Sequence, residues 1–225
     1  ITSLKYMENI DKAGIEGMGK LVLLTTGQAV GTFFGYKVEG VDPATGNIIY
    51  ADVNGNGIKN IGPNGEVFDT GDRTFIGDLN PNYIFAFSNN FTYKNWYLDT
   101  LITGSIGNEI YNASRFELEL MNDFKNQSTA VLDRWTTVGQ VTNVPRANSL
   151  SAMVISDRFL EDGSYVKLKS VTLGYNFKNP FKGVSKLNVY ATGQNLYTIT
   201  DYSGFDPEVN AFANETGVLG IDYGT

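Results

Sequence analysis

The chain contains no cysteine and no histidine among its 225 residues. Without cysteine it has no disulfide, no thiolate nucleophile and no cysteine-based zinc site. Without histidine it lacks the Ser-His-Asp arrangement and every histidine metal site. Catalysis would have to use carboxylates, lysine, tyrosine or serine, so the sequence predicts that the protein is not an enzyme.

Long hydrophobic runs and excess positive charge are also missing. No apolar run approaches the roughly 20 residues that a membrane-spanning helix requires, so any membrane-spanning part must consist of strands. The formal net charge is −7. Nucleic-acid binding depends on lysine and arginine neutralising phosphates, so this charge argues against a nucleic-acid partner. The chain shows no signal peptide, and we expect both of its ends to lie inside a longer polypeptide.

Aromatic residues and glycine are abundant, with 13 Tyr, 14 Phe and 25 Gly, as is typical of many strands joined by turns. Residues 83–93 alternate most clearly: aromatic side chains share one face, interrupted by Asn89, and small or polar side chains share the other. A tilted strand needs about 9–11 residues to cross a bilayer, which matches this segment. Residues 94–95 then form a two-residue turn, flanked by Tyr93 and Trp96 where an interfacial aromatic girdle would lie.

Three further segments show the same alternation of apolar and polar side chains. Their apolar faces comprise Trp96, Leu98, Ile102 and Ile106; Val171, Leu173, Tyr175 and Phe177; and Leu187, Val189 and Ala191. Their polar faces comprise Tyr97, Asp99, Thr103 and Ser105; Ser170, Thr172, Gly174 and Asn176; and Asn188, Tyr190, Thr192 and Gln194. By the same count Lys167 and Lys169 share the apolar face with Val171. A charge costs about 2–4 kcal/mol at the bilayer midplane but almost nothing near the interface, so we expect both lysines to contact lipid head groups.

An apolar face opposite a face of amides, hydroxyls and tyrosines fits a strand between lipid and a water-filled lumen. It also fits one sheet of a soluble sandwich, so a secreted or surface β-sandwich that binds glycans, with calcium as an optional stabilising ion, is the alternative. Connection lengths favour the barrel: residues 94–95 and 179–185 are short, whereas residues 27–82 form a long polar loop and residues 107–163 a very long connection. The predicted fold is all-β, part of a large antiparallel transmembrane β-barrel with short periplasmic turns and long extracellular loops.

The second long connection contains a predicted helix. Residues 115–125 are rich in helix formers, with Phe116, Leu120 and Phe124 at helical spacing. Ser128 or Thr129 would cap a short turn that follows, over residues 130–135.

One motif suggests a metal. Asp52, Asn54, Asn56 and Gly57 match the opening of a calcium loop, in which alternate oxygen ligands converge and glycine makes a sharp turn. The match ends there, because Pro63 stands where a bidentate glutamate belongs. A plain Asn/Gly turn is therefore the favoured interpretation, and calcium, the only candidate cofactor, is the alternative. More distant candidate ligands are Glu66, Asp69 and Asp72.

Short segments along the chain carry little information singly but form an ordered series. They are Met7-Glu8-Asn9, Gly14-Ile15-Glu16, residues 31–37 (GTFFGYK), residues 52–57 (DVNGNG), Ile110-Tyr111-Asn112, residues 133–136 (DRWT), Pro145-Arg146-Ala147, residues 156–159 (SDRF), residues 162–165 (DGSY), residues 193–197 (GQNLY) and residues 204–208 (GFDPE). In this order, over nearly the whole chain, they resemble the C-terminal barrel portion of SusC/RagA-type TonB-linked outer-membrane proteins.

The resemblance implies both a location and a function. Residues 1–225 would be the C-terminal portion of a TonB-dependent receptor barrel in the outer membrane of a Gram-negative bacterium. The plug, the TonB-contacting segment and the terminal strand of the family have no counterpart here, and residues would be missing near 16–21. The implied function is import of a bulky nutrient, an oligosaccharide or a peptide, with this chain supplying barrel wall and extracellular loops. Implied partners are a SusD-like surface lipoprotein, TonB acting through the N-terminal part, the cargo and outer-membrane lipid.

Overall fold

The structure, a computed structural model, describes residues 10–15, 19–24, 27–57, 70–208 and 220–222. The chain divides into two compact units. Unit 1 comprises Ile1–Asn80, Glu109–Glu161 and Gly204–Thr225, and unit 2 comprises Pro81–Asn108 and Asp162–Ser203. In the described ranges, no helix has both the length and the apolar character that a membrane crossing requires.

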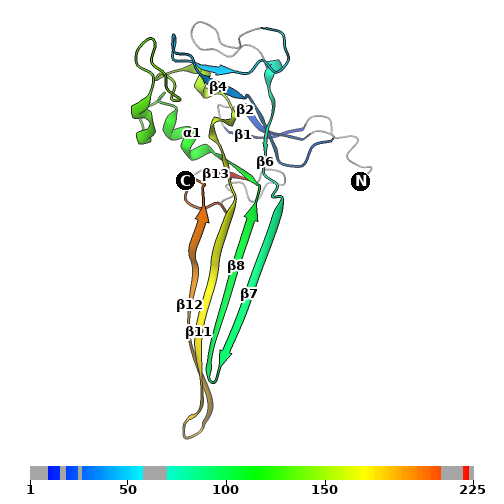
Figure 1. Cartoon of the computed structure of the whole chain (residues 1–225), viewed down its shortest axis with the longest axis vertical. Helices are drawn as coiled ribbons and strands as arrows, with labels where there is room; N and C mark the ends of the chain where they lie inside the picture. Colours follow the sequence, from blue (N-terminus) through cyan, green and yellow to red (C-terminus); the bar gives the residue numbers. More distant parts are fainter. Residues whose placement is uncertain (1–9, 16–18, 25–26, 58–69, 209–219, 223–225) are drawn as a thin grey trace. The chain divides into compact units, whose positions relative to one another are not determined.

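Unit 2 is one antiparallel sheet in the strand order β12-β11-β8-β7, and Figure 1 shows its four long strands side by side. The strands are β7 (Tyr83–Tyr93), β8 (Trp96–Ile106), β11 (Tyr165–Phe181) and β12 (Val184–Thr200). Strands β7 and β8 pair without a register shift. The predicted turn between them is confirmed, and Lys94 in it adopts a φ of 55°, as the first position of a tight hairpin turn requires.

The register confirms the predicted faces of unit 2. Phe87 lies opposite Ile102 and Ser88 opposite Leu101, so we name the two sides of the sheet the apolar face and the polar face, respectively. Large side chains of the apolar face are exposed, with Phe87 at 58%. Asn89, the polar interruption of that face, lies opposite Thr100, and its Nδ2 donates to Thr100 Oγ1 over 3.5 Å. The apolar side chains of this sheet therefore have no second sheet packed over them in the described part of the chain.

A β-bulge in β11 overturns the prediction for Lys167. Leu168 lies opposite Ile102 of β8, but Ser170 lies opposite Leu101, so Lys169 is an inserted residue. The insertion reverses the alternation on its N-terminal side, because side chains change face at every residue of a regular strand. Leu168 therefore lies on the apolar face, and Lys167 lies on the polar face, where it is buried. Strict alternation counted back from Val171 places Lys167 on the apolar face, because that count does not include the bulge at Lys169.

The second hairpin turn is tighter than residues 179–185 suggested. Strand β11 continues to Phe181 and β12 starts at Val184, so residues 182–183 make the turn. The register shifts between Lys178 and Phe181, and Asn179 there has a φ of 48°. Asparagine tolerates this left-handed conformation, which lets the two strands stay paired beyond the bulge.

Unit 1 contains most of the two long connections, together with segments near both ends of the chain. One sheet has the order β1-β2-β3-β6, and β4 pairs with β5 in a separate ribbon. A third sheet has the order β10-β9-β13, in which β13 runs parallel to β9. The strands are β1 (Ile10–Ile15), β2 (Gly19–Leu24), β3 (Thr32–Gly35), β4 (Val38–Val41), β5 (Ile48–Tyr50), β6 (Thr74–Asp78), β9 (Glu109–Asn112), β10 (Leu160–Asp162) and β13 (Ile221–Asp222). Short 3-10 helices are η2 (Thr70–Asp72), η3 (Thr129–Asp133), η4 (Leu150–Met153) and η5 (Asp157–Phe159).

The two long connections, residues 27–82 and 107–163, contain regular structure and a core of their own in their described parts. Their strands bury a hydrophobic core that contains Phe33, Tyr111, Phe116 and Phe159, each at most 1% exposed. Phe159 packs edge-on against Phe116, with ring centroids 5.2 Å apart. The apolar side chains are spread singly along polar sequence, so their shared core becomes visible only after the chain has folded.

The helix in this unit is α1 (Ala113–Glu119), which starts and ends before the predicted 115–125. It starts early because the side chain of Asn112 caps it, accepting the backbone N–H of Arg115 at 2.8 Å. It ends early because Met121 adopts a φ of 54°, which no α-helix continues through. The short turn that follows is confirmed as η3, capped by the Ser128 hydroxyl, which accepts the N–H of Ala130 at 3.2 Å.

Candidate functional site

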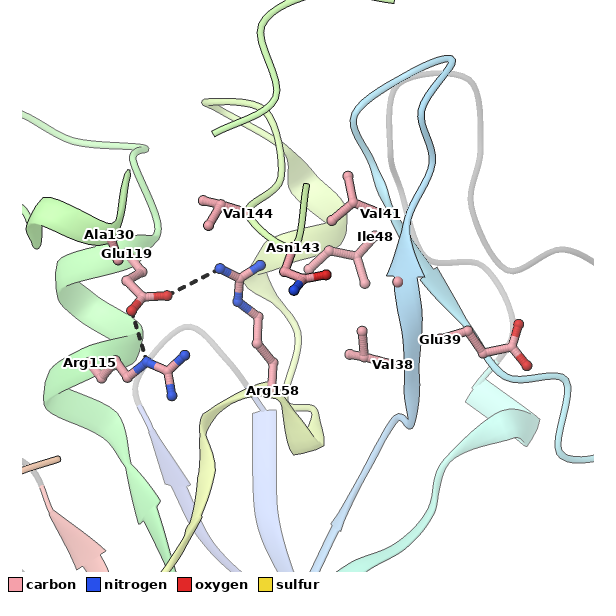
Figure 2. A pocket seen from close by; sticks show the side chains of 11 residues that line it. Val38, Glu39, Val41, Ile48, Arg115, Glu119, Ala130, Asn143, Val144 and Arg158 are labelled. Atoms are coloured by element: carbon pink, nitrogen blue, oxygen red, sulfur yellow. Dashed lines mark hydrogen bonds and ion pairs between the residues drawn. The ribbon is translucent and has the colours of Figure 1, made fainter. Parts of the chain in front are cut away.

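Unit 1 contains a pocket of about 390 Å³ (Figure 2). Its apolar walls include Val38 and Val41 of β4 together with Val144. Its charged wall consists of Arg115 and Glu119 of α1 and Arg158 of η5. The pocket thus combines small aliphatic side chains with two guanidinium groups.

Local structure explains how these side chains meet. Helix α1 places Arg115 and Glu119 one turn apart, at the i,i+4 spacing that allows an ion pair. Strand β4 and η5 are tied together because Asp157 Oδ1 accepts the backbone N–H of Val38 at 2.9 Å. Burial of Phe159 in the core then fixes η5, and Arg158 beside it is directed to α1 (Figure 2).

The charged wall is a network of two arginines and two glutamates. Arg115 Nε donates to Glu119 Oε1 at 2.8 Å, and its Nη1 donates to Glu161 Oε1 at 3.1 Å. Arg158 Nη2 donates to Glu119 Oε2 at 3.1 Å. The Glu119 side chain is 4% exposed and that of Arg158 is 9% exposed. Glu119 therefore serves both arginines, one with each carboxylate oxygen.

The environment acts differently on the two arginines. Burial lowers the pKa of Arg158 below its ordinary value, and the hydrogen bond and charge of Glu119 only partly oppose this effect. Burial also acts to lower the pKa of Arg115, but its contacts with Glu119 and Glu161 outweigh burial and raise that pKa. Arg158 is thus the cation whose desolvation is less well compensated.

The sequence predictions did not include this pocket. Arg158 lies within the 156–159 segment that resembles the SusC/RagA family, but its partner Glu119 is 39 residues away along the chain. Nothing in the spacing of the two residues indicates contact. The resemblance of the segment and the predicted helix over residues 115–125 pointed to this part of unit 1, but neither brought Arg158 and Glu119 together.

The structure places the candidate calcium residues in one turn. Asp52 Oδ1 accepts the N–H groups of Gly55 and Asn56 at 2.7 and 3.1 Å, and Asp52 Oδ2 accepts that of Gly57 at 2.8 Å. Asn54 Oδ1 accepts the N–H of Asn56 at 3.0 Å. The Asn54 bond has the two-residue spacing of an Asx turn, whereas the Asp52 bonds reach three to five residues along the chain.

Of the more distant candidate ligands, Asp72 is fully buried, and its Oδ1 accepts the N–H groups of Val53 and Asn54. Glu66 and Asp69 lie outside the described residues. No group of three or more acidic side chains suited to a metal occurs in the described part of the chain. The calcium site at Asp52, Asn54 and Asn56 stays a prediction.

Calorimetry tests the calcium prediction. If the loop binds calcium, titrating the intact receptor with Ca²⁺ will release heat, and Asp52→Ala will remove that heat because it deletes the one carboxylate of the loop opening. Asp42→Ala is the matched control, since Asp42 closes a neighbouring turn by accepting the N–H of Ala44 at 2.9 Å. Equal heats from the unmodified protein and Asp52→Ala would leave the segment as a turn alone.

The polar face of unit 2 carries tyrosines and amides close together. The Tyr97 hydroxyl donates to Asn188 Oδ1 at 3.2 Å, and Asn188 Nδ2 donates to Asn176 Oδ1 at 3.0 Å. Gly174 permits this arrangement, because a Cβ at that position would collide with the Tyr97 ring. The result is a polar network across β8, β11 and β12.

Comparison with known proteins assigns the chain to a family, although no family profile matches it. It is 33% identical over 226 aligned positions to the TonB-dependent receptor P3 of Formosa agariphila, covering 90% of this chain and 21% of that protein. It is 27% identical to the TonB-dependent receptor SusC of Bacteroides thetaiotaomicron, over 92% of this chain and 20% of SusC. Its fold matches the RagAB peptide transporter with a TM-score of 0.68 at 23% identity, over 85% of this chain and 20% of that one. The chain belongs to the SusC/RagA-type TonB-dependent receptors.

The receptor chain spans about a fifth of the length of the curated relatives that it matches. Like its family, it is an outer-membrane protein of a Gram-negative bacterium. Unit 2 is accordingly part of the wall of an antiparallel transmembrane β-barrel, which is not closed within the described residues. The apolar face of unit 2 is the lipid-facing side, and the polar face lines the lumen.

Proposed function

We propose that the complete receptor imports a bulky nutrient across the outer membrane with energy supplied through TonB. Unit 2 contributes barrel wall, and the long connections between its strands supply extracellular loops. The observation that carries the proposal is the two-faced sheet of unit 2, in a chain whose relatives are TonB-dependent receptors. The proposed role is transport and not catalysis.

The proposed cargo is an oligosaccharide or a peptide. The RagAB structure is that of a peptide transporter, and its similar fold is the basis for proposing peptide cargo for this receptor. Oligosaccharide cargo is supported by the polar face, where Tyr97 and Tyr190 lie among amide side chains. Sugar rings pack on aromatic faces while their hydroxyls bond amides. A SusD-like surface lipoprotein and TonB are the proposed protein partners.

Uptake measurements test the proposal. Deleting the complete receptor gene in its host is expected to abolish uptake of one class of labelled oligosaccharide or peptide, and the intact gene is expected to restore it. Loss of TonB should abolish the same uptake, because the proposed import draws its energy through TonB. Uptake that persists without TonB would contradict the proposal even if the receptor were required.

A further inference from the structure

Arg158 is the less well paired of the two arginines in the unit 1 pocket. A guanidinium has five N–H donors. Among the described residues, Arg158 has a single hydrogen-bond acceptor, Glu119 Oε2, and its Nε is buried without one. The other oxygen of Glu119 accepts from Arg115 Nε at 2.8 Å.

The pocket next to this guanidinium has an aliphatic side and is large enough for a small molecule. Val38, Val41 and Val144 line it with aliphatic carbon, and Figure 2 shows the carboxylate of Glu39 directed away from Arg158. Its volume of about 390 Å³ falls among small-molecule sites, which span roughly 300–1,000 Å³. A group entering it would meet small apolar side chains and the two arginines, with the Glu119 carboxylate and the Asn143 amide beside them.

We propose that this pocket binds a carboxylate that carries a short aliphatic group, and that this group is part of the cargo. A carboxylate would accept charge-assisted hydrogen bonds from donors that Glu119 leaves unused, and guanidinium and carboxylate match in geometry. The aliphatic part would cover Val38, Val41 and Val144. A neutral sugar fits less well, because it brings no charge to the arginine and finds aliphatic walls in place of aromatic rings.

Binding of a matched pair of probes tests the proposal. N-acetyl-divaline, with a free carboxylate, and N-acetyl-divaline amide differ only at the group that Arg158 would contact. Calorimetry on the complete receptor in detergent is expected to show the acid binding about tenfold or more tightly than the amide, since a hydrogen bond to a charged group contributes about 1.5–3 kcal/mol. Arg158→Gln should remove that preference.

Two further variants keep the test decisive if Arg158→Gln folds poorly. Val144→Phe fills the pocket while leaving the Arg158–Glu119 ion pair intact, and it should weaken binding of the acid about as much as Arg158→Gln does. Arg134→Gln makes the same chemical change outside the pocket, where Arg134 bonds the carbonyl of Val131, and it should bind like the unmodified receptor. Equal affinities for acid and amide, or no binding of either, would overturn the proposal.

This inference rests on the proposed function only for the statement that the carboxylate belongs to cargo. If TonB-dependent uptake fails but the acid still binds through Arg158, the pocket stands and the import proposal does not. If uptake is established but acid and amide bind equally, import stands and the pocket proposal does not.

Discussion

Phe87→Arg is expected to prevent assembly of the receptor in the outer membrane, whereas Ser88→Arg is expected to leave assembly intact. The two residues are neighbours in the middle of β7, and they lie on opposite faces of the sheet. Arginine at position 87 would place a charge among lipid chains near the midplane, at a cost of about 2–4 kcal/mol. Arginine at position 88 would point into the water-filled lumen, where its charge stays hydrated.

The measurement is the fraction of receptor that is folded in outer-membrane preparations, read from the heat-dependent shift of the barrel on a gel. Ser88→Arg is the matched control, because it adds the same side chain one residue away on the same strand. Equal tolerance of both substitutions, or a greater loss with Ser88→Arg, would contradict the assignment of faces. Ser88→Arg is also expected to alter cargo passage, which uptake assays would reveal.

The second large effect is expected from Glu119→Gln. This change removes the carboxylate that pairs with both Arg115 and Arg158, and Arg158 would keep no charged acceptor among the described residues. Breaking a buried ion pair by removing one partner costs about 3–5 kcal/mol, because the remaining charge stays buried. Hydrogen exchange of the α1 amides would report this loss as faster local opening.

Glu117→Gln is the control on the same helix. Glu117 pairs with Lys125, but both side chains are about one-third exposed, so loss of this ion pair is expected to cost about 0–1 kcal/mol. A similar acceleration of exchange in both variants would show that helix propensity, and not the shared carboxylate, controls the stability of α1.

The faces of unit 2 could be predicted from the sequence because alternation in a strand depends only on residue parity. The prediction succeeded wherever pairing is regular, as from Phe87 to Tyr93. It failed for Lys167 because an inserted residue reverses the parity and leaves no mark in composition. Bulges are a property of two strands together, so one strand's sequence does not specify them.

Unit 1 was harder to predict because its contacts are distant in sequence. Phe33, Tyr111 and Phe159 come from three separate parts of the chain and meet in one core. The pocket depends on the same long-range packing, since Arg158 reaches Glu119 only when η5 and α1 are both anchored by that core. The end of α1 was missed because the left-handed backbone of Met121 is set by its surroundings and not by its own preference.

The register shift that displaced Lys167 also has a mechanical consequence. Over one stretch of sheet, β8 advances by one residue from Leu101 to Ile102, β11 advances by two from Ser170 to Leu168, and β12 advances by three from Gln194 to Tyr197. Over this stretch, each strand in the series β8, β11, β12 therefore contains one residue more than the one before it. Such insertions bend the strands that carry them and increase the local right-handed twist, so the sheet is expected to coil most strongly at this level.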